Sequence, residues 1–466
     1  MTAQTILPAN TLSSGGFDVT NSLRFNRGSS DYLSRATNVT GTNTKFTLSF
    51  WIKLCDTANF QRVFEVYKAS NERVDCGFNL DNAGEPRFFI QEYTGSYIYR
   101  KIFTRLSRDV AAWTHYVIKY DSSEGEANRL KVYINGVLET ATDQANLPGD
   151  GATSIISVGT QHIGYSQNNS GHHLNGYLAE FVLIEGTDYD PTSFGEFDED
   201  SGIWKPIKIS GLTFGTNGFH LEFKGSGTSA NSSGMGADTS GNDHHFTVNN
   251  LTALDQSTDT CTNNFATWNS LFRKGTTTPA FTEGNLKSTF DDGGANEFAL
   301  TTFGVSAGKW YAEVKWTSAT GTGATATGIL DMNYTGTADP NNAVTNAFGY
   351  FGSGQKNVSG TASNYGASYG AGDIIGLLIN CDDNELIFQK NGASQASGTA
   401  IDIVAGVTYG IFASDYNNKV AELNTGAAPY AISSGNADGN GHGNFEYSVP
   451  SGYLALNSKN LAESGG

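Results

Sequence analysis

The chain has 466 residues, of which 38% are hydrophobic, 12% aromatic and 16% charged, with 56 glycines and only 9 prolines. This length suits two domains that each bury a core, the glycines lack the period of collagen, and the recurring aromatic and β-branched residues argue against disorder. The net charge of −18 repels phosphate backbones, so we expect no nucleic-acid partner.

The cysteines and the apolar runs indicate the cell compartment in which the chain folds. Cys55, Cys76, Cys261 and Cys381 form no C-x-x-C pair and no disulfide framework, so we expect reduced thiols and folding in a cytoplasm. Residues 1–10 lack the basic and apolar regions of a secretion signal. The longest apolar run, 374–379, is far too short to cross a bilayer, so we expect no membrane insertion.

Strand signals are dense between residues 22 and 185. The segments are short, alternate with a period of two or are wholly apolar, and end at Gly, Asn or Asp. Asn135-Gly136 predicts a type I′ hairpin turn. These patterns predict an antiparallel sandwich with strands at 23–25, 46–52, 63–67, 87–93, 113–120, 130–134 and 177–184.

Several of these segments carry a family resemblance. The segments 22–25 (SLRF), 31–35 (DYLSR), 46–52 (FTLSFWI), 113–117 (WTHYV), 130–136 (LKVYING) and 174–181 (LNGYLAEF) occur in the order found in laminin-G-like domains. The W-x-H-x-V and Y-x-N-G steps are the most specific of them. The region resembles a laminin-G-like, concanavalin-A-like jelly roll, which implies binding of glycans or proteins.

The second half contains another set of strands. These include 308–316 (GKWYAEVKW), 372–380 (GDIIGLLIN), 385–392 (ELIFQKNG) with an Asn-Gly turn, and 409–414 (YGIFAS). Their order resembles a SPRY domain, which implies binding of proteins, although the Gly- and Tyr-rich region 321–370 departs from that pattern.

The expected fold class is all-β, with two antiparallel β-sandwiches joined by an irregular connector. The predicted parts are an N-terminal arm (1–21), a jelly roll (22–225), a connector (226–283), a SPRY-like sandwich (284–425) and a C-terminal tail that packs back (426–466).

This domain pair resembles structural proteins attributed to marine tailed phages. The resemblance implies a non-enzymatic virion protein, made in the host cytoplasm and displayed on the particle surface as a fibre or decoration subunit. Its partners would be other virion proteins or a host-surface glycan, and we expect a homo-oligomer. A capsid decoration protein with no host ligand is the alternative within the same class.

Tyrosines are the candidate ligand-binding residues. Tyr supplies rigid contact area with a polar tip, and it is enriched in recognition surfaces. If their strand is continuous, Tyr93, Tyr97 and Tyr99 share one face. The full predicted set is Tyr93, Tyr97, Tyr99, Tyr334, Tyr350, Tyr365 and Tyr369.

Two acidic segments offer alternatives. Asp238, Asn242 and Asp243 provide the hard oxygen ligands that a structural Ca²⁺ prefers, whereas Asx-turns explain the same residues without a metal. We expect no other cofactor.

Glu196, Asp198 and Asp200 would share a face of a strand, as the carboxylates of jelly-roll glucanases do, which makes a glycoside hydrolase the alternative enzyme function. The surrounding loop signals favour the non-enzymatic interpretation.

Overall fold

The computed structural model describes residues 16–37, 43–81, 83–272, 279–291 and 296–464. They form almost only antiparallel strands, so the all-β prediction is confirmed. The chain divides into two compact units, with the boundary of the described residues between Thr262 and Asn263, and each unit is described by itself. Among the described residues, no helix has the length and apolar character to cross a membrane.

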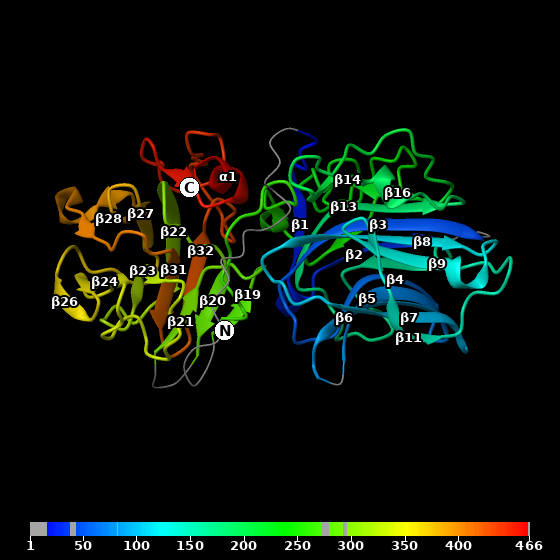
Figure 1. Cartoon of the computed structure of the whole chain (residues 1–466), viewed down its shortest axis with the longest axis horizontal. Coiled ribbons are helices and arrows are strands. Elements are labelled where there is room, and N and C mark those ends of the chain that lie inside the picture. The colour runs from blue at the N-terminus through cyan, green and yellow to red at the C-terminus, as the bar shows by residue number, and fades with distance from the viewer. Residues whose placement is uncertain (1–15, 38–42, 82, 273–278, 292–295, 465–466) are drawn as a thin grey trace. The chain divides into compact units, whose positions relative to one another are not determined.

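The first unit is a sandwich of two eight-stranded sheets, seen as two layers in Figure 1. The back sheet has the order β10 (Val137–Leu138), β9 (Leu130–Ile134), β8 (Trp113–Asp121), β3 (Lys45–Leu54), β13 (Gly176–Glu185), β1 (Ser22–Phe25) and β18 (Gln256–Ser257), and β16 (Phe219–Leu221) also pairs with β13. The front sheet has the order β11 (Ala141–Ala145), β7 (Tyr97–Leu106), β6 (Pro86–Thr94), β5 (Glu72–Leu80), β4 (Gln61–Ala69), β12 (Gly159–Ile163), β2 (Tyr32–Thr37) and β17 (Thr247–Asn249).

The alternation in the sequence explains which side chains fill the space between the sheets. In β9, Leu130, Val132 and Ile134 are buried core residues, whereas the intervening Lys131 and Tyr133 are half-buried. β13 is buried on both faces, because the outer face of the back sheet is covered as well. Its cover consists of the hairpin of β14 (Gly195–Phe197) and β15 (Trp204–Pro206), the segments 189–194 and 207–214, and parts of 17–19 and 259–261.

The Asn135-Gly136 turn has the backbone that its sequence predicts. Asn135 has φ 48° and Gly136 has φ 76°, as a type I′ turn between β9 and β10 requires. Gly is needed here for a second reason: a Cβ on Gly136 would lie 2.4 Å from the ring of Trp204. The turn therefore fixes the place of the β14–β15 hairpin on the back sheet.

Residues 226–262 are not a connector but part of the first sandwich. β17 extends the front sheet and β18 extends the back sheet. Met235 and Phe246 are fully buried in the same core. The sequence favoured a connector because these strands have only three and two residues, too few for an alternation to show. In the predicted N-terminal arm, residues 1–15 lie outside the described part, and Val19 is buried against the back sheet.

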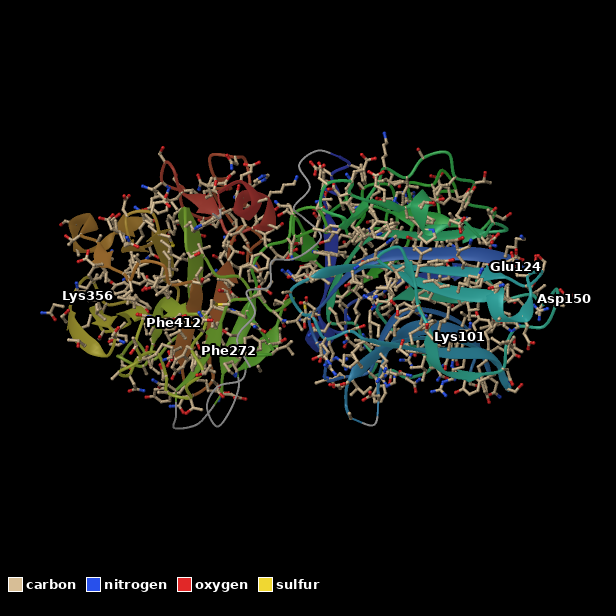
Figure 2. All side chains as sticks on the ribbon, viewed as in Figure 1. Lys101, Glu124, Asp150, Phe272, Lys356 and Phe412 are labelled. Carbon is tan, nitrogen blue, oxygen red and sulfur yellow. The ribbon has the colours of Figure 1, made fainter. Side chains whose placement is uncertain are left out.

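The second unit is also a sandwich of two sheets. The larger has the order β19 (Ala280–Thr282), β20 (Lys287–Phe290), β32 (Lys419–Asn424), β22 (Lys309–Ser318), β27 (Ile374–Asn380), β28 (Glu385–Lys390) and β29 (Ala393–Ser394), joined by β30 (Ile401–Asp402) and β33 (Leu454–Ala455). The smaller has the order β21 (Glu297–Leu300), β31 (Tyr409–Asp415), β23 (Ala326–Asp331), β24 (Ala347–Phe351), β25 (Gln355–Val358) and β26 (Thr361–Asn364). Phe412, labelled in Figure 2, is fully buried in its core.

The C-terminal residues pack on the larger sheet of this unit. β33 pairs in parallel with the start of β22, and α1 (Ser458–Ser464) follows it. Phe445 and Ala455 are buried against Tyr311 of β22. Short 3₁₀ turns complete the fold at η1 (Arg27–Ser29), η2 (Glu126–Asn128), η3 (Pro191–Ser193), η4 (Ala253–Asp255) and η5 (Gln395–Gly398).

Candidate ligand-binding face

The outer face of the front sheet carries polar and aromatic side chains. On β5, Val74 and Cys76 point into the core, so Arg73 and Asp75, which alternate with them, point outward. Their neighbours across the strands share this face, because Glu65 and Gln91 are in register with Asp75. Four adjacent strands, β4 to β7, carry this polar layer; Glu65, Asp75 and Gln91 are buried within it, whereas Arg73 is half-buried and reaches the surface.

Three arginines on this surface each stack on an aromatic ring. The guanidinium carbon of Arg62 lies 4.4 Å from the centre of the Phe89 ring, that of Arg73 lies 4.7 Å from Tyr93, and that of Arg100 lies 5.6 Å from Tyr97. We call these six residues the arginine–aromatic row. The attraction between cation and ring restricts these long side chains before any ligand binds. Binding therefore costs less side-chain entropy.

Asp75 fixes two of the guanidinium groups. Its Oδ1 lies 3.0 Å from Nε of Arg62, and its Oδ2 lies 3.4 Å from Nε of Arg73. Gln91 donates to both carboxylate oxygens, at 3.2 and 3.0 Å. Asp75 thus pairs with two arginines of the row, in a chain whose net charge is −18.

This arrangement has the two properties that recognition of a sugar needs. Tyr93 and Tyr97 are half-buried, and their rings meet edge to face with centres 5.3 Å apart, so they offer a rigid apolar surface. Guanidinium groups offer N–H donors in a fixed fork, to which hydroxyl or carboxylate oxygens can bond. Such rings offer an apolar face to a ligand, and the neighbouring guanidinium groups offer donors to its oxygens.

A β-bulge corrects the prediction for Tyr99. Glu92 pairs with Tyr99 but Tyr93 pairs with Tyr97, so Ile98 is an extra residue in β7. The bulge reverses the alternation, and Tyr99 is fully buried in the core instead of sharing a face with Tyr97. Tyr93 and Tyr97 are brought together, as the sequence predicts, but Tyr99 cannot touch a ligand.

A loop after β12 borders the row. Glu65 Oε1 accepts a 2.6 Å hydrogen bond from Ser166 Oγ, and Glu65 Oε2 accepts one of 2.6 Å from the Gln167 N–H. Burial raises the pKa of Glu65 to about 7, and burial lowers the pKa of the adjacent His162 to about 4. The ring of Tyr165 in this loop stacks on His173 at 4.8 Å, so the loop is held against the sheet by packing as well.

The predicted tyrosines of the second unit serve its own packing. Tyr350 and Tyr369 are buried, and Tyr369 donates a 2.6 Å hydrogen bond to the Tyr350 carbonyl, so neither can contact a ligand as predicted. Tyr365 is half-buried, and its ring meets Tyr350 edge-on at 5.5 Å. Tyr334 is half-buried against the core, and its hydroxyl donates to the Ala338 carbonyl at 2.8 Å. Figure 2 labels Lys356, whose ammonium lies 5.9 Å from the Tyr365 ring.

The predicted calcium ligands make a hydrogen-bonded turn instead. Asp238 accepts from the backbone N–H groups of His220, Ser240 and His244 and from the Ser240 hydroxyl, at 2.8 to 2.9 Å. These donors occupy its oxygens and would repel a cation. Asn242 donates its amide to the carbonyls of Gly215 and Gly218, and the Asp243 side chain is 90% exposed. The metal prediction therefore fails on geometry, and no group of three or more His, Cys, Asp or Glu within the described ranges is placed to hold an ion.

The carboxylates of the glucanase alternative do not form a catalytic pair. Asp198 accepts from Ser201 and, at 3.0 Å, from Lys205, and these contacts hold its pKa well below its usual range. Glu196 and Asp200 are exposed. A general acid needs a carboxyl whose pKa is raised, whereas the contacts of Asp198 lower its own.

Sequence reasoning missed the arginines. Arg62, Arg73 and Arg100 lie in strands that the sequence could locate only in part, and their stacking partners come from neighbouring strands. The available signal was the spacing between Arg73 and Asp75, which places both on one face of any strand.

Comparison with known proteins agrees with this fold. Residues 27–187 match the model of the concanavalin A-like lectin/glucanases superfamily, and residues 309–427 match the SPRY domain. The chain thus carries a laminin-G-like, concanavalin-A-like domain and a SPRY domain. No curated protein matches the chain.

Solved structures with similar folds include domains of both kinds. The SPRY domain of human HERC1 is 18% identical, with 30% of this chain and 87% of that chain covered and a TM-score of 0.25. A heptameric SAP-like pentraxin from Limulus polyphemus is 17% identical, with coverage of 36% and 78% and a TM-score of 0.26. A human SPRY domain is 17% identical, with coverage of 32% and 94% and a TM-score of 0.24.

Proposed function

We propose that this chain is a non-enzymatic binding protein whose first domain binds a surface glycan through the arginine–aromatic row. The observation that carries the proposal is the pair of guanidinium–ring stacks, Arg73 on Tyr93 and Arg100 on Tyr97, that reach the outer face of β5 to β7. The third stack, Arg62 on Phe89, is buried and supports the others from within. The outer face of the back sheet is covered by the chain's own apolar side chains, so it offers no comparable surface.

The proposal includes where the protein acts. The domain pair resembles structural proteins of tailed phages, so we propose a fibre or decoration subunit on the surface of a virion, made in the host cytoplasm. Its partners would then be neighbouring virion proteins and the host glycan, and it would act as a homo-oligomer. Many copies on one particle would convert a weak single site into avid attachment.

A glycan array probed with the purified full chain tests the binding. We expect signals from a limited set of glycans, lost in Tyr93→Ala and kept in Arg108→Ala, which removes an exposed arginine outside the row. An empty array would contradict the glycan proposal, whereas equal signals from both variants would place the site elsewhere.

Electron cryo-microscopy of intact particles with labelled protein tests the location. Density at the tail would support host recognition, and regular density on the capsid lattice would favour a decoration role without a host ligand. Absence from the particles would overturn the virion assignment.

A further inference from the structure

Lys53 and Asp259 form an ion pair that is withdrawn from water. The Lys53 side chain is 0% exposed and the Asp259 side chain 2% exposed, and Lys53 Nζ lies 2.8 Å from Asp259 Oδ2. The two residues are 206 positions apart, so the contact joins a central strand of the back sheet to the last segment of the first unit.

The surroundings of the pair are aromatic. The Trp113 indole N–H donates a 3.0 Å hydrogen bond to Asp259 Oδ1, the oxygen that does not face Lys53. The Tyr177 ring has its centre 5.6 Å from Lys53 Nζ. Trp113 and Tyr177 belong to a buried apolar cluster with Trp51, Trp204 and Cys261. Removal of two charges from water is costly, and an ion pair regains only part of that cost.

We propose that Lys53 and Asp259 condense to an isopeptide bond. The lysine Nζ becomes bonded to the aspartate Cγ, and the C–O bond to Oδ2 breaks. This link would be a covalent modification of the chain, formed without a cofactor, and it goes beyond the proposed binding function.

The atoms of the reaction balance within the pair. A proton passes from the ammonium to Oδ2 along the 2.8 Å hydrogen bond, which leaves a neutral amine beside a neutral carboxylic acid. The amine lone pair attacks Cγ, and Oδ2 leaves as water with a second proton from the same nitrogen. The ammonium and carboxylate together become one amide and one water molecule, with no oxidant or other reactant.

Two features of the site promote these steps. The hydrogen bond keeps the nucleophile beside Cγ, so the reaction has the advantage of an intramolecular one. Trp113 Nε1–H already points at Oδ1, the oxygen on which negative charge develops in the tetrahedral intermediate. The product exchanges a buried ion pair for a neutral amide, which removes the charges from the aromatic cluster.

Intact-mass spectrometry of the purified, folded full chain tests the proposal without any variant. The expected mass is that of the sequence less one water molecule, and a tryptic digest should contain a branched peptide that joins the segments around Lys53 and Asp259. The Lys45–Asp121 pair is the internal control: its lysine is 37% exposed, and it should yield only linear peptides.

Variants then locate the link. Lys53→Arg should have the full mass of its sequence, and Asp259→Asn should lose one ammonia instead of one water. A full-length mass for the folded wild-type chain, with no branched peptide, would overturn the proposal. Loss of water in Lys53→Arg would overturn it as well.

Discussion

Replacement of Glu313 tests how the C-terminal residues are held on the second unit. Glu313 lies on β22 and is 0% exposed. Its carboxylate accepts hydrogen bonds from the Glu446 N–H at 3.0 Å, the Tyr447 N–H at 2.8 Å, the Asn424 amide at 3.1 Å and the Tyr311 hydroxyl at 3.1 Å. Glu313→Ala removes the shared acceptor and leaves these donors buried.

The structure sets the size of the effect. Each orphaned buried donor costs about 1–3 kcal/mol, and relaxation of the C-terminal segment lets some of the four reach water, so we expect Glu313→Ala to lower the free energy of unfolding by about 3–5 kcal/mol. For a unit of this size that corresponds to a fall in Tm of about 6–20 °C. The loss of stability in Glu313→Gln should be smaller than in Glu313→Ala, because the amide carbonyl still accepts some of these hydrogen bonds.

Thermal unfolding of the full chain measures the shift, and hydrogen exchange shows whether residues 445–456 lose protection first. Glu385→Ala is the control, because Glu385 lies half-buried on β28 of the same sheet and should change the stability by no more than about 0.5 kcal/mol. A Glu313→Ala protein as stable as the control, with a protected C-terminal segment, would refute the reasoning.

Three further predictions concern the first unit. Burial raises the pKa of Glu65 and Glu92 to about 7, so the folded chain holds protons that the unfolded chain has released. Their contribution to stability is present at low pH and lost as the pH rises through 7, by about 0.8 kcal/mol for each group between about pH 6.5 and about pH 8. Histidines of the same unit with lowered pKa act in the opposite direction over this range, so the test is a difference: in urea unfolding the wild type should lose about 0.8 kcal/mol more than Glu92→Gln between the two pH values, and an equal change in both would contradict it. Gly136→Ala should cost about 1–3 kcal/mol more than Gly151→Ala in thermal unfolding, because both have positive φ but only Gly136 faces a side chain, the Trp204 ring. Equal losses would show that the ring contact does not matter. Addition of EDTA should leave Tm unchanged, since Asp238 already bonds to four donors, and a lower Tm would reveal a bound ion.

The sequence was informative wherever a pattern is local. The alternation in 130–134, the Asn-Gly turn that follows it and the apolar run at 177–184 all occur in the structure as read. Asn391-Gly392 also has positive φ at both residues, in the turn that joins β28 to β29. Turn chemistry and the two-residue period depend on few neighbours, so a single sequence can reveal them.

The remainder depends on contacts between distant residues. The extra residue at Ile98 moves Tyr99 into the core, and nothing in the residues Tyr97 to Tyr99 announces it. The two-residue strand β18 exists only because β1 is there to pair with it. The arginine–aromatic row joins side chains from four strands, so its charge and shape appear only once the register of the front sheet is known.

Titration of the best ligand from the array into wild-type protein, Arg73→Ala and Arg108→Ala tests the central claim most directly. The account predicts that Arg73→Ala weakens binding at least about tenfold, as loss of a buried contact worth about 1.4 kcal/mol would, and that Arg108→Ala binds like the wild type. Equal affinity of all three proteins would contradict the assignment of the site to the outer face of β4 to β7.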